Sequence, residues 1–87
     1  MKHHHIIIKG KVGNTGFRLF ALRGASKYGI CGEVLEKDGE IIVDVEGDET
    51  KLQFFEEWCR KGPEGSQVET LICTDKEVIG YEDFKIL

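Results

Sequence analysis

The residues best suited to chemistry lie between Val12 and Arg18, where the chain reads Val-Gly-Asn-Thr-Gly-Phe-Arg. The stretch joins a β-branched segment to a helical pattern, and N–H groups at a helix start lack intrahelical acceptors. The helix dipole adds partial positive charge there, and small residues let an anion reach the backbone. Arg18 can donate two parallel hydrogen bonds to phosphate oxygens. The sequence therefore predicts a phosphate-binding loop made of Gly13, Asn14, Thr15, Gly16, Phe17 and Arg18.

The elements around this loop follow from periodicity and turn residues. Residues 5–12 are β-branched, which predicts a strand, and apolar residues spaced three and four apart over 17–28 predict a helix that Gly29 ends. Two apolar runs, 30–37 and 40–46, flank Asp38-Gly39, a strong hairpin signal. A second helix is expected from Asp48 or Thr50 to Gly62-Pro63. Residues 67–74 alternate as a strand, 74–77 are polar and loop-like, and 84–87 predict a last short strand.

This order predicts an α+β fold, a ferredoxin-like βαββαβ sandwich in which two helices cover one face of an antiparallel sheet. One domain is expected over residues 5–87, after a flexible N-terminus at residues 1–4. The run His3-His4-His5 is interpreted as part of that flexible end or as a tag remnant, and no metal site is predicted. Because this fold hosts many functions, only the site residues can indicate the activity.

Composition narrows the class of protein. The 87 residues carry 12 basic and 16 acidic side chains, and no apolar run approaches the roughly 20 residues of a membrane span. The first 32 residues hold six basic residues and no acid, a charge pattern compatible with an anion-binding surface. Taken alone, the pattern favours a sheet that mixes the basic and acidic segments, so that the surface charge averages out. Three cysteines, Cys31, Cys59 and Cys73, form no Cys-x-x-Cys pair and predict small buried thiols. We expect a cytoplasmic monomer.

The loop also resembles a known signature. Gly10-Lys11-Val12-Gly13-Asn14-Thr15-Gly16-Phe17-Arg18 resembles the Gly-Arg-Val-Gln-Gly-Val-Gly-Phe-Arg stretch of acylphosphatases. The order and spacing of further landmarks fit the same family over essentially residues 5–87. They are Asp38-Gly39, Gly47, Phe55, Trp58, Gly62-Pro63 and Phe84-Lys85-Ile86.

The resemblance implies hydrolysis of a carboxyl-phosphate anhydride to a carboxylate and inorganic phosphate. It implies that the loop and Arg18 hold the phosphoryl group, and that an asparagine on the strand after the first helix positions the attacking water. It also implies that no metal, cofactor or covalent intermediate takes part. The expected partner is a small acyl phosphate, or inorganic phosphate or sulfate.

The chain departs from the family at one decisive position. Glu36 stands where acylphosphatases have the water-positioning asparagine, and Asn14 is the only asparagine in this sequence. An ionised carboxylate beside a phosphate repels it, although Glu36 acting as a general base on water is the open alternative. Two functions stay open. One is hydrolysis, weakened by Glu36, with Arg18 and Glu36 as catalytic candidates; the other is a non-enzymatic anion-binding or interaction module. Nucleic-acid binding is disfavoured, because residues 33–87 hold all 16 acids.

Overall fold

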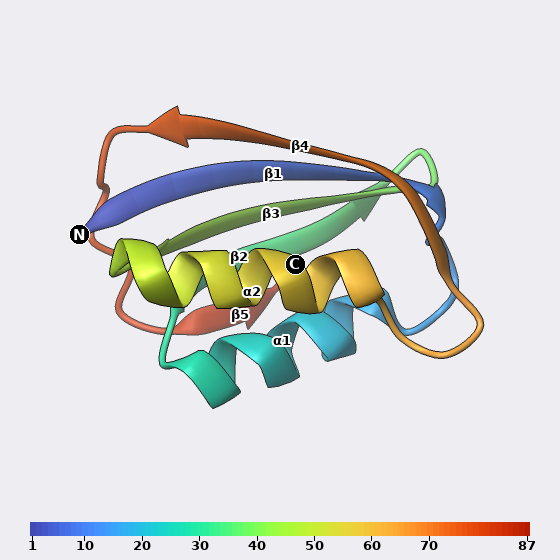
Figure 1. Cartoon of the computed structure of the whole chain (residues 1–87), viewed down its shortest axis with the longest axis horizontal. Helices are drawn as coiled ribbons and strands as arrows, with labels where there is room; N and C mark the ends of the chain where they lie inside the picture. Colours follow the sequence, from blue (N-terminus) through green and yellow to red (C-terminus); the bar gives the residue numbers. More distant parts are fainter.

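The computed structural model describes residues 1–87 and shows one sheet with two helices on one face (Figure 1). The chain forms β1 (Lys2–Lys11), α1 (Phe17–Tyr28), β2 (Cys31–Lys37), β3 (Glu40–Gly47), α2 (Glu49–Lys61), β4 (Gln67–Lys76) and β5 (Phe84–Ile86). The strand order is β4-β1-β3-β2-β5. The ferredoxin-like prediction is confirmed, and β5 pairs in parallel with β2 at the edge of four antiparallel strands. Neither helix has the length and apolar character needed to cross a bilayer.

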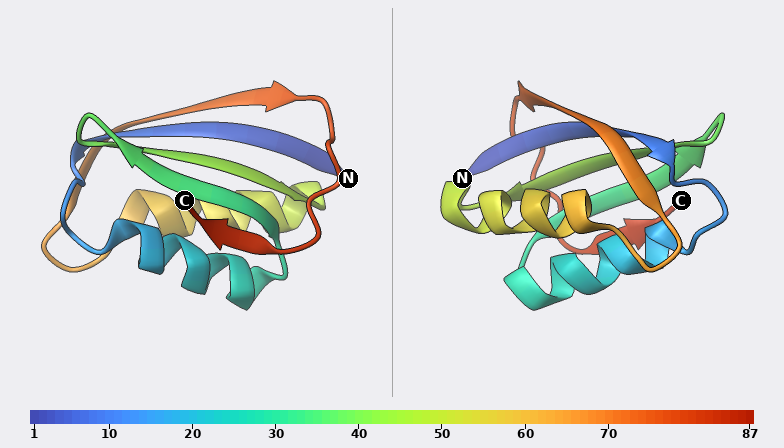
Figure 2. Two further views of the ribbon diagram at one scale, coloured as in Figure 1. Left: turned by 180° about the vertical axis from the view of Figure 1, so that it is seen from behind. Right: turned by 45° about the vertical axis from the view of Figure 1, so that its right-hand side comes forward.

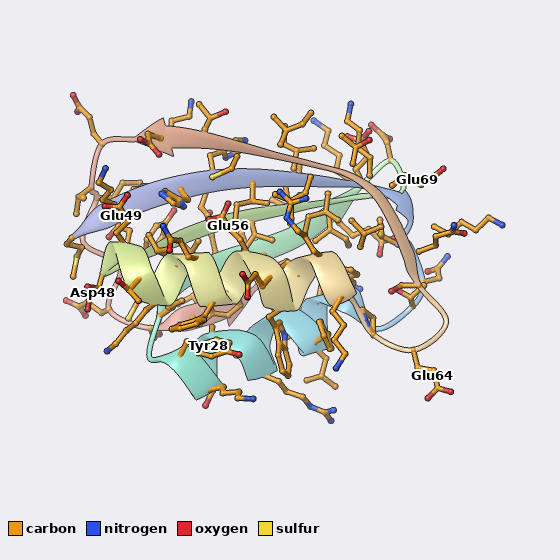
Figure 3. The ribbon with its side chains drawn as sticks, viewed as in Figure 1. Tyr28, Asp48, Glu49, Glu56, Glu64 and Glu69 are labelled. Carbon is orange, nitrogen blue, oxygen red and sulfur yellow. The ribbon has the colours of Figure 1, made fainter.

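The core fills the space between the sheet and the two helices. Alternate residues of each central strand point toward the helices, as the pleat requires. Phe17 of α1 and Phe55 of α2 are the largest side chains that are fully buried there. Tyr28 lies between the helices, with its ring stacked on Phe54 at 5.8 Å between centroids (Figure 3). These contacts fix α1, and therefore the loop that precedes it, against the sheet.

Glycines terminate the elements where the sequence predicts. Gly29 closes α1 in the left-handed conformation at φ 67°, and Gly62 closes α2 at φ 66°. The hairpin between β2 and β3 turns through Asp38 at φ 53° and Gly39 at φ 77°, the positive values that a two-residue hairpin turn requires. Asp48 is the N-cap of α2, but its side chain makes no capping hydrogen bond.

Two expectations about loops are wrong. Residues 2–4 are not a flexible end, because β1 begins at Lys2 and the residues His3 and His4 are 3% and 8% exposed. The histidines pair with β3 on one side and with residues 74–76 of β4 on the other, so β4 continues to Lys76 instead of ending in a loop. These strand ends are composed of polar residues, which give no strand signal in the sequence. They pair nevertheless, because the hydrogen bonds between strands are made by backbone groups and do not depend on side-chain hydropathy.

Candidate phosphate-binding site

The loop between β1 and α1 has two residues in the left-handed backbone conformation and is held by internal hydrogen bonds. Asn14 and Gly16 have positive φ values of 57° and 78°, so an asparagine occupies a backbone conformation that otherwise favours glycine. The Thr15 hydroxyl donates a hydrogen bond to the carbonyl oxygen of Val12 at 2.5 Å. The Phe20 N–H donates to the carbonyl oxygen of Gly16 at 3.0 Å, which starts the helix. The loop is therefore held at both ends by its own hydrogen bonds.

The closed loop leaves several backbone donors free. The N–H groups of Thr15, Gly16, Phe17 and Arg18 have no backbone acceptor, as expected at the start of a helix. No acidic residue lies in the first turn of α1, so no side chain of the helix itself neutralises the positive end of its dipole. A run of free N–H groups at a helix start suits an anion the size of phosphate.

Arg18 lies beside this set of donors and pairs with no Asp or Glu side chain. Its Nη1 donates a hydrogen bond to the main-chain oxygen of Leu87 at 3.3 Å. Figure 2 shows the C-terminus close to the loop that leads into α1. The guanidinium is therefore positioned by a main-chain oxygen of Leu87, the last residue of the sequence, and not by an acidic side chain.

Glu36 also reaches this loop, from β2. Its Oε1 accepts a hydrogen bond from the Asn14 N–H at 3.3 Å. Its Oε2 lies 3.5 Å from the position that a Cβ at Gly13 would occupy. The structure thus brings the loop, Arg18 and Glu36 to one end of the sheet, and the Glu36 carboxylate holds one donor that an incoming anion would use.

Comparisons with known proteins show the family of this chain. Residues 4–86 match the acylphosphatase family. This chain belongs to the acylphosphatase family. It is 37% identical to the acylphosphatase of Thermotoga petrophila over 87 residues, covering 99% of this chain and 97% of that protein. It is 35% identical to the acylphosphatase of Synechococcus sp., covering 92% and 90%. The crystal structure of acylphosphatase from Bacillus subtilis superposes with a TM-score of 0.97 at 32% identity, covering 100% of this chain and 99% of that one.

This acylphosphatase-family chain also holds a buried carboxylate that sequence reasoning missed. Glu46 is 2% exposed and accepts hydrogen bonds from the N–H groups of Ile79, Gly80 and Tyr81 at 2.6 to 3.0 Å. Burial raises the pKa of Glu46, but these three donors and the neighbouring His3 outweigh it, and the net pKa is lowered. In the sequence, the alternation Asp44-Val45-Glu46 indicates only that the two acidic side chains lie on one face of a strand. It does not indicate that Glu46 is buried. The carboxylate fixes the segment that leads into β5.

The cysteines divide between two environments. Cys59 is buried in the core, and this burial raises the pKa of its thiol, as expected for a small structural cysteine. Cys31 is half-buried, whereas Cys73 is exposed on the edge strand β4, so the expectation of buried thiols is wrong for Cys73. Partial desolvation and the nearby Glu56 carboxylate raise the pKa of Cys73 to about 12. This thiol is therefore protonated at neutral pH, which disfavours a role as a free nucleophile.

Proposed function

We propose that this protein hydrolyses acyl phosphates to a carboxylate and inorganic phosphate, with the phosphoryl group bound by the loop 12–18. The observation that carries the proposal is the set of free N–H groups from Thr15 to Arg18 beside a guanidinium that pairs with no Asp or Glu side chain. Membership of the acylphosphatase family supports the same reaction class. The small acyl group needs no pocket of its own, because the loop recognises the phosphoryl end that all acyl phosphates share.

The chemistry suits the residues. Phosphoryl transfer needs positioning and charge stabilisation more than covalent side-chain chemistry. The loop N–H groups and Arg18 would bind the non-bridging oxygens and stabilise the charge that they carry in the transition state. Water forms the new P–O bond, the bond between phosphorus and the acyl oxygen breaks, and the carboxylate leaves with the electron pair. The proton lost by water passes to solvent or to a phosphate oxygen.

Glu36 gives this reaction an internal competitor. To use the Asn14 N–H, a phosphoryl oxygen must displace the Glu36 carboxylate from it. Both groups are anions, so the carboxylate also repels the substrate wherever it moves within a few ångströms. We infer that Glu36 weakens hydrolysis compared with a chain that carries asparagine there. If the repulsion prevails, the site becomes an anion-binding module without turnover, which is the second candidate function.

The decisive experiment measures hydrolysis of benzoyl phosphate in buffer that contains EDTA, for the wild type, Arg18→Ala and Arg23→Ala. Arg23 lies on the same helix and is exposed, so it is a matched control for the loss of one positive charge. Turnover by the wild type and by Arg23→Ala, with a loss of about 100-fold or more in Arg18→Ala, supports the enzyme.

Background turnover in the wild type would refute hydrolysis. In that case the thermal stability is measured with and without inorganic phosphate. Stabilisation that disappears in Arg18→Ala would support the anion-binding module, and the absence of any stabilisation would refute both functions.

A further inference from the structure

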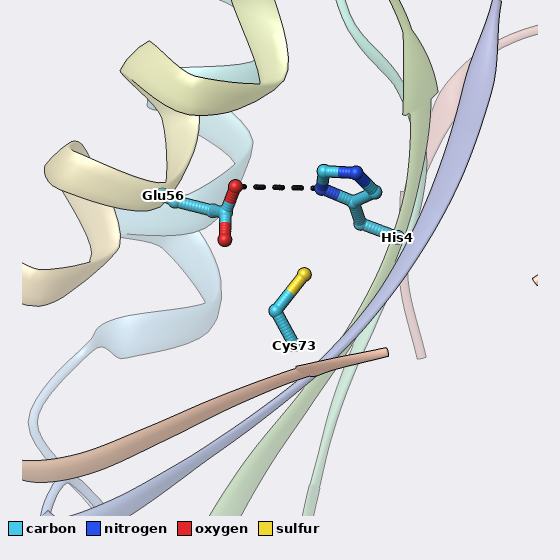
Figure 4. A group of neighbouring side chains, drawn as sticks. All are labelled: His4, Glu56 and Cys73. Atoms are coloured by element: carbon cyan, nitrogen blue, oxygen red, sulfur yellow. Dashed lines mark ion pairs between the residues drawn. The ribbon is translucent and has the colours of Figure 1, made fainter. Parts of the chain in front are cut away.

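A second cluster of chemically active side chains lies at the other end of β1, where the sequence analysis predicts no site. His4 of β1, Glu56 of α2 and Cys73 of β4 each offer one donor atom, and the three atoms all lie within 4.8 Å of one another (Figure 4). Ile6 pairs with Cys73 and His4 pairs with Asp75, so Cys73 and Asp75 lie on the helix-facing side of β4 together with His4. Glu56 approaches this group from α2 (Figure 3). Three elements distant in sequence therefore converge on one point.

His4 has a buried ring nitrogen that makes no hydrogen bond. The residue is 8% exposed, and its Nδ1 atom is fully buried without a hydrogen-bond partner. That atom faces Glu56 Oε2 at 3.4 Å, while Nε2 faces Asp75 Oδ1 at 3.4 Å. Buried polar atoms are nearly always hydrogen-bonded, and leaving one unpaired costs free energy. A buried ring nitrogen that lies near a carboxylate and a thiol, and that has no hydrogen-bond partner, is available to bind a metal ion.

The donor set and its spacing select the kind of ion. An imidazole nitrogen, a sulfur and a carboxylate oxygen together suit zinc, whereas magnesium and calcium prefer oxygen alone. In a tetrahedral zinc site these donors are separated by about 3.3–3.6 Å. The distance of 3.4 Å between His4 Nδ1 and Glu56 Oε2 already lies in this range. The widest separation must shorten by up to about 1.2 Å, which rotation of the exposed Cys73 side chain can supply.

We propose that His4 Nδ1, a Glu56 carboxylate oxygen and Cys73 Sγ bind a divalent transition-metal ion, zinc being the best match. The Asp75 carboxylate would accept a hydrogen bond from His4 Nε2–H, which fixes the ring tautomer, as carboxylates do behind metal-bound histidines. Binding releases the thiol proton of Cys73 to solvent and leaves a thiolate on the ion. Water completes the fourth position, because Cys73 lies on an exposed edge strand.

This site is separate from the phosphate-binding loop. Val12 follows His4 by eight positions along β1 and its end, which corresponds to about 26 Å of extended chain. The ion would therefore join the edge strand β4 to β1 and α2 without touching a bound phosphoryl group. The proposal does not depend on the proposed hydrolysis, and its failure would leave that function untouched.

The test uses Co²⁺ as a spectroscopic probe on the whole, reduced protein after removal of metals with EDTA. We expect a near-ultraviolet thiolate-to-cobalt absorption band that Zn²⁺ abolishes by competition. The band should be absent in Cys73→Ser and present in Cys31→Ser, the matched thiol control. Asp75→Asn should weaken Zn²⁺ binding about 10- to 100-fold, whereas Arg18→Ala should leave it unchanged.

The histidine variants separate this site from the rest of the histidine run. His4→Gln should weaken Zn²⁺ binding at least tenfold, and His5→Gln should not, because His5 contacts Asp44 on the other face of the sheet. Circular dichroism checks that each variant is folded. If His4→Gln does not fold, Cys73→Ser still tests the site. The absence of a thiolate band in the wild type, or its persistence in Cys73→Ser, would overturn the proposal.

Discussion

Replacing Glu36 by glutamine should strengthen the binding of anions to the loop. The substitution keeps the length of the side chain and its amide oxygen can still accept from the Asn14 N–H, now observed at 3.3 Å from Glu36 Oε1. The negative charge is lost, and one carboxylate oxygen becomes an NH2 group that can donate hydrogen bonds. The substitution therefore changes the polarity of the side chain while keeping the shape of the site.

The magnitude follows from the geometry. A phosphoryl group that uses the same loop donors would carry its charge about 5 Å from the carboxylate. Two unit charges at this distance repel by about 3 kcal/mol at an effective dielectric of 20, and by about 0.8 kcal/mol at the dielectric of water. Glu36 is half-buried, so the true value lies between these limits. We expect inorganic phosphate to bind between about 4-fold and 200-fold more tightly to Glu36→Gln.

The assay is titration calorimetry with inorganic phosphate at low and at moderate ionic strength. Glu33→Gln is the matched control, because Glu33 lies on the same strand but on the face away from the loop. Salt should reduce the difference between Glu36→Gln and the wild type, since it screens exposed charges. An affinity that is unchanged, or lower, in Glu36→Gln would refute the reasoning that Glu36 competes with the anion.

Three further substitutions test the chemistry and the packing. Glu36→Asn should raise the rate of benzoyl phosphate hydrolysis above that of Glu36→Gln, because it introduces the water-positioning asparagine that the family resemblance implies at this position; equal rates would contradict a water-positioning role. Glu46→Gln should lower the free energy of unfolding at pH 7 by about 1–3 kcal/mol in urea titrations. Because the pKa of Glu46 is lowered by folding, its contribution is complete above the ordinary value of 4.5 and disappears as the pH falls below it, so the two proteins should converge in acid. Gly24→Ala should lower the melting temperature despite the helix propensity of alanine, because a Cβ there would overlap the Trp58 ring; a more stable variant would show that the helices separate easily.

The sequence predicts the elements well where periodicity and turn residues agree. The helix at 17–28, the Asp38-Gly39 hairpin and the helix end at Gly62 all follow from local rules, and the structure confirms them. The free backbone donors of the candidate phosphate-binding loop are predictable for the same reason, because their exposure depends on the helix start.

The features that cannot be predicted from the sequence depend on contacts between residues far apart in the chain. His3 and His4 are buried only because β3 and β4 flank them, and no local pattern places Glu56 or Cys73 beside His4. Glu46 is a surface residue by type, and its burial depends on a loop more than 30 residues later. Such contacts are set by topology, which hydropathy and spacing do not encode.

The position of β1 between β3 and β4 also has a kinetic consequence. Residue 3 pairs with residue 76, so the last ladder closes a loop that contains most of the chain. Contacts this distant in sequence impose a large entropic cost on the transition state and slow the folding of small domains. During synthesis, β1 can pair with β3 early, but its second edge has no partner until residues 67–76 have been made. Throughout that interval the Ile6–Ile8 segment presents an open strand edge, where another chain could pair before the protein's own last strand arrives.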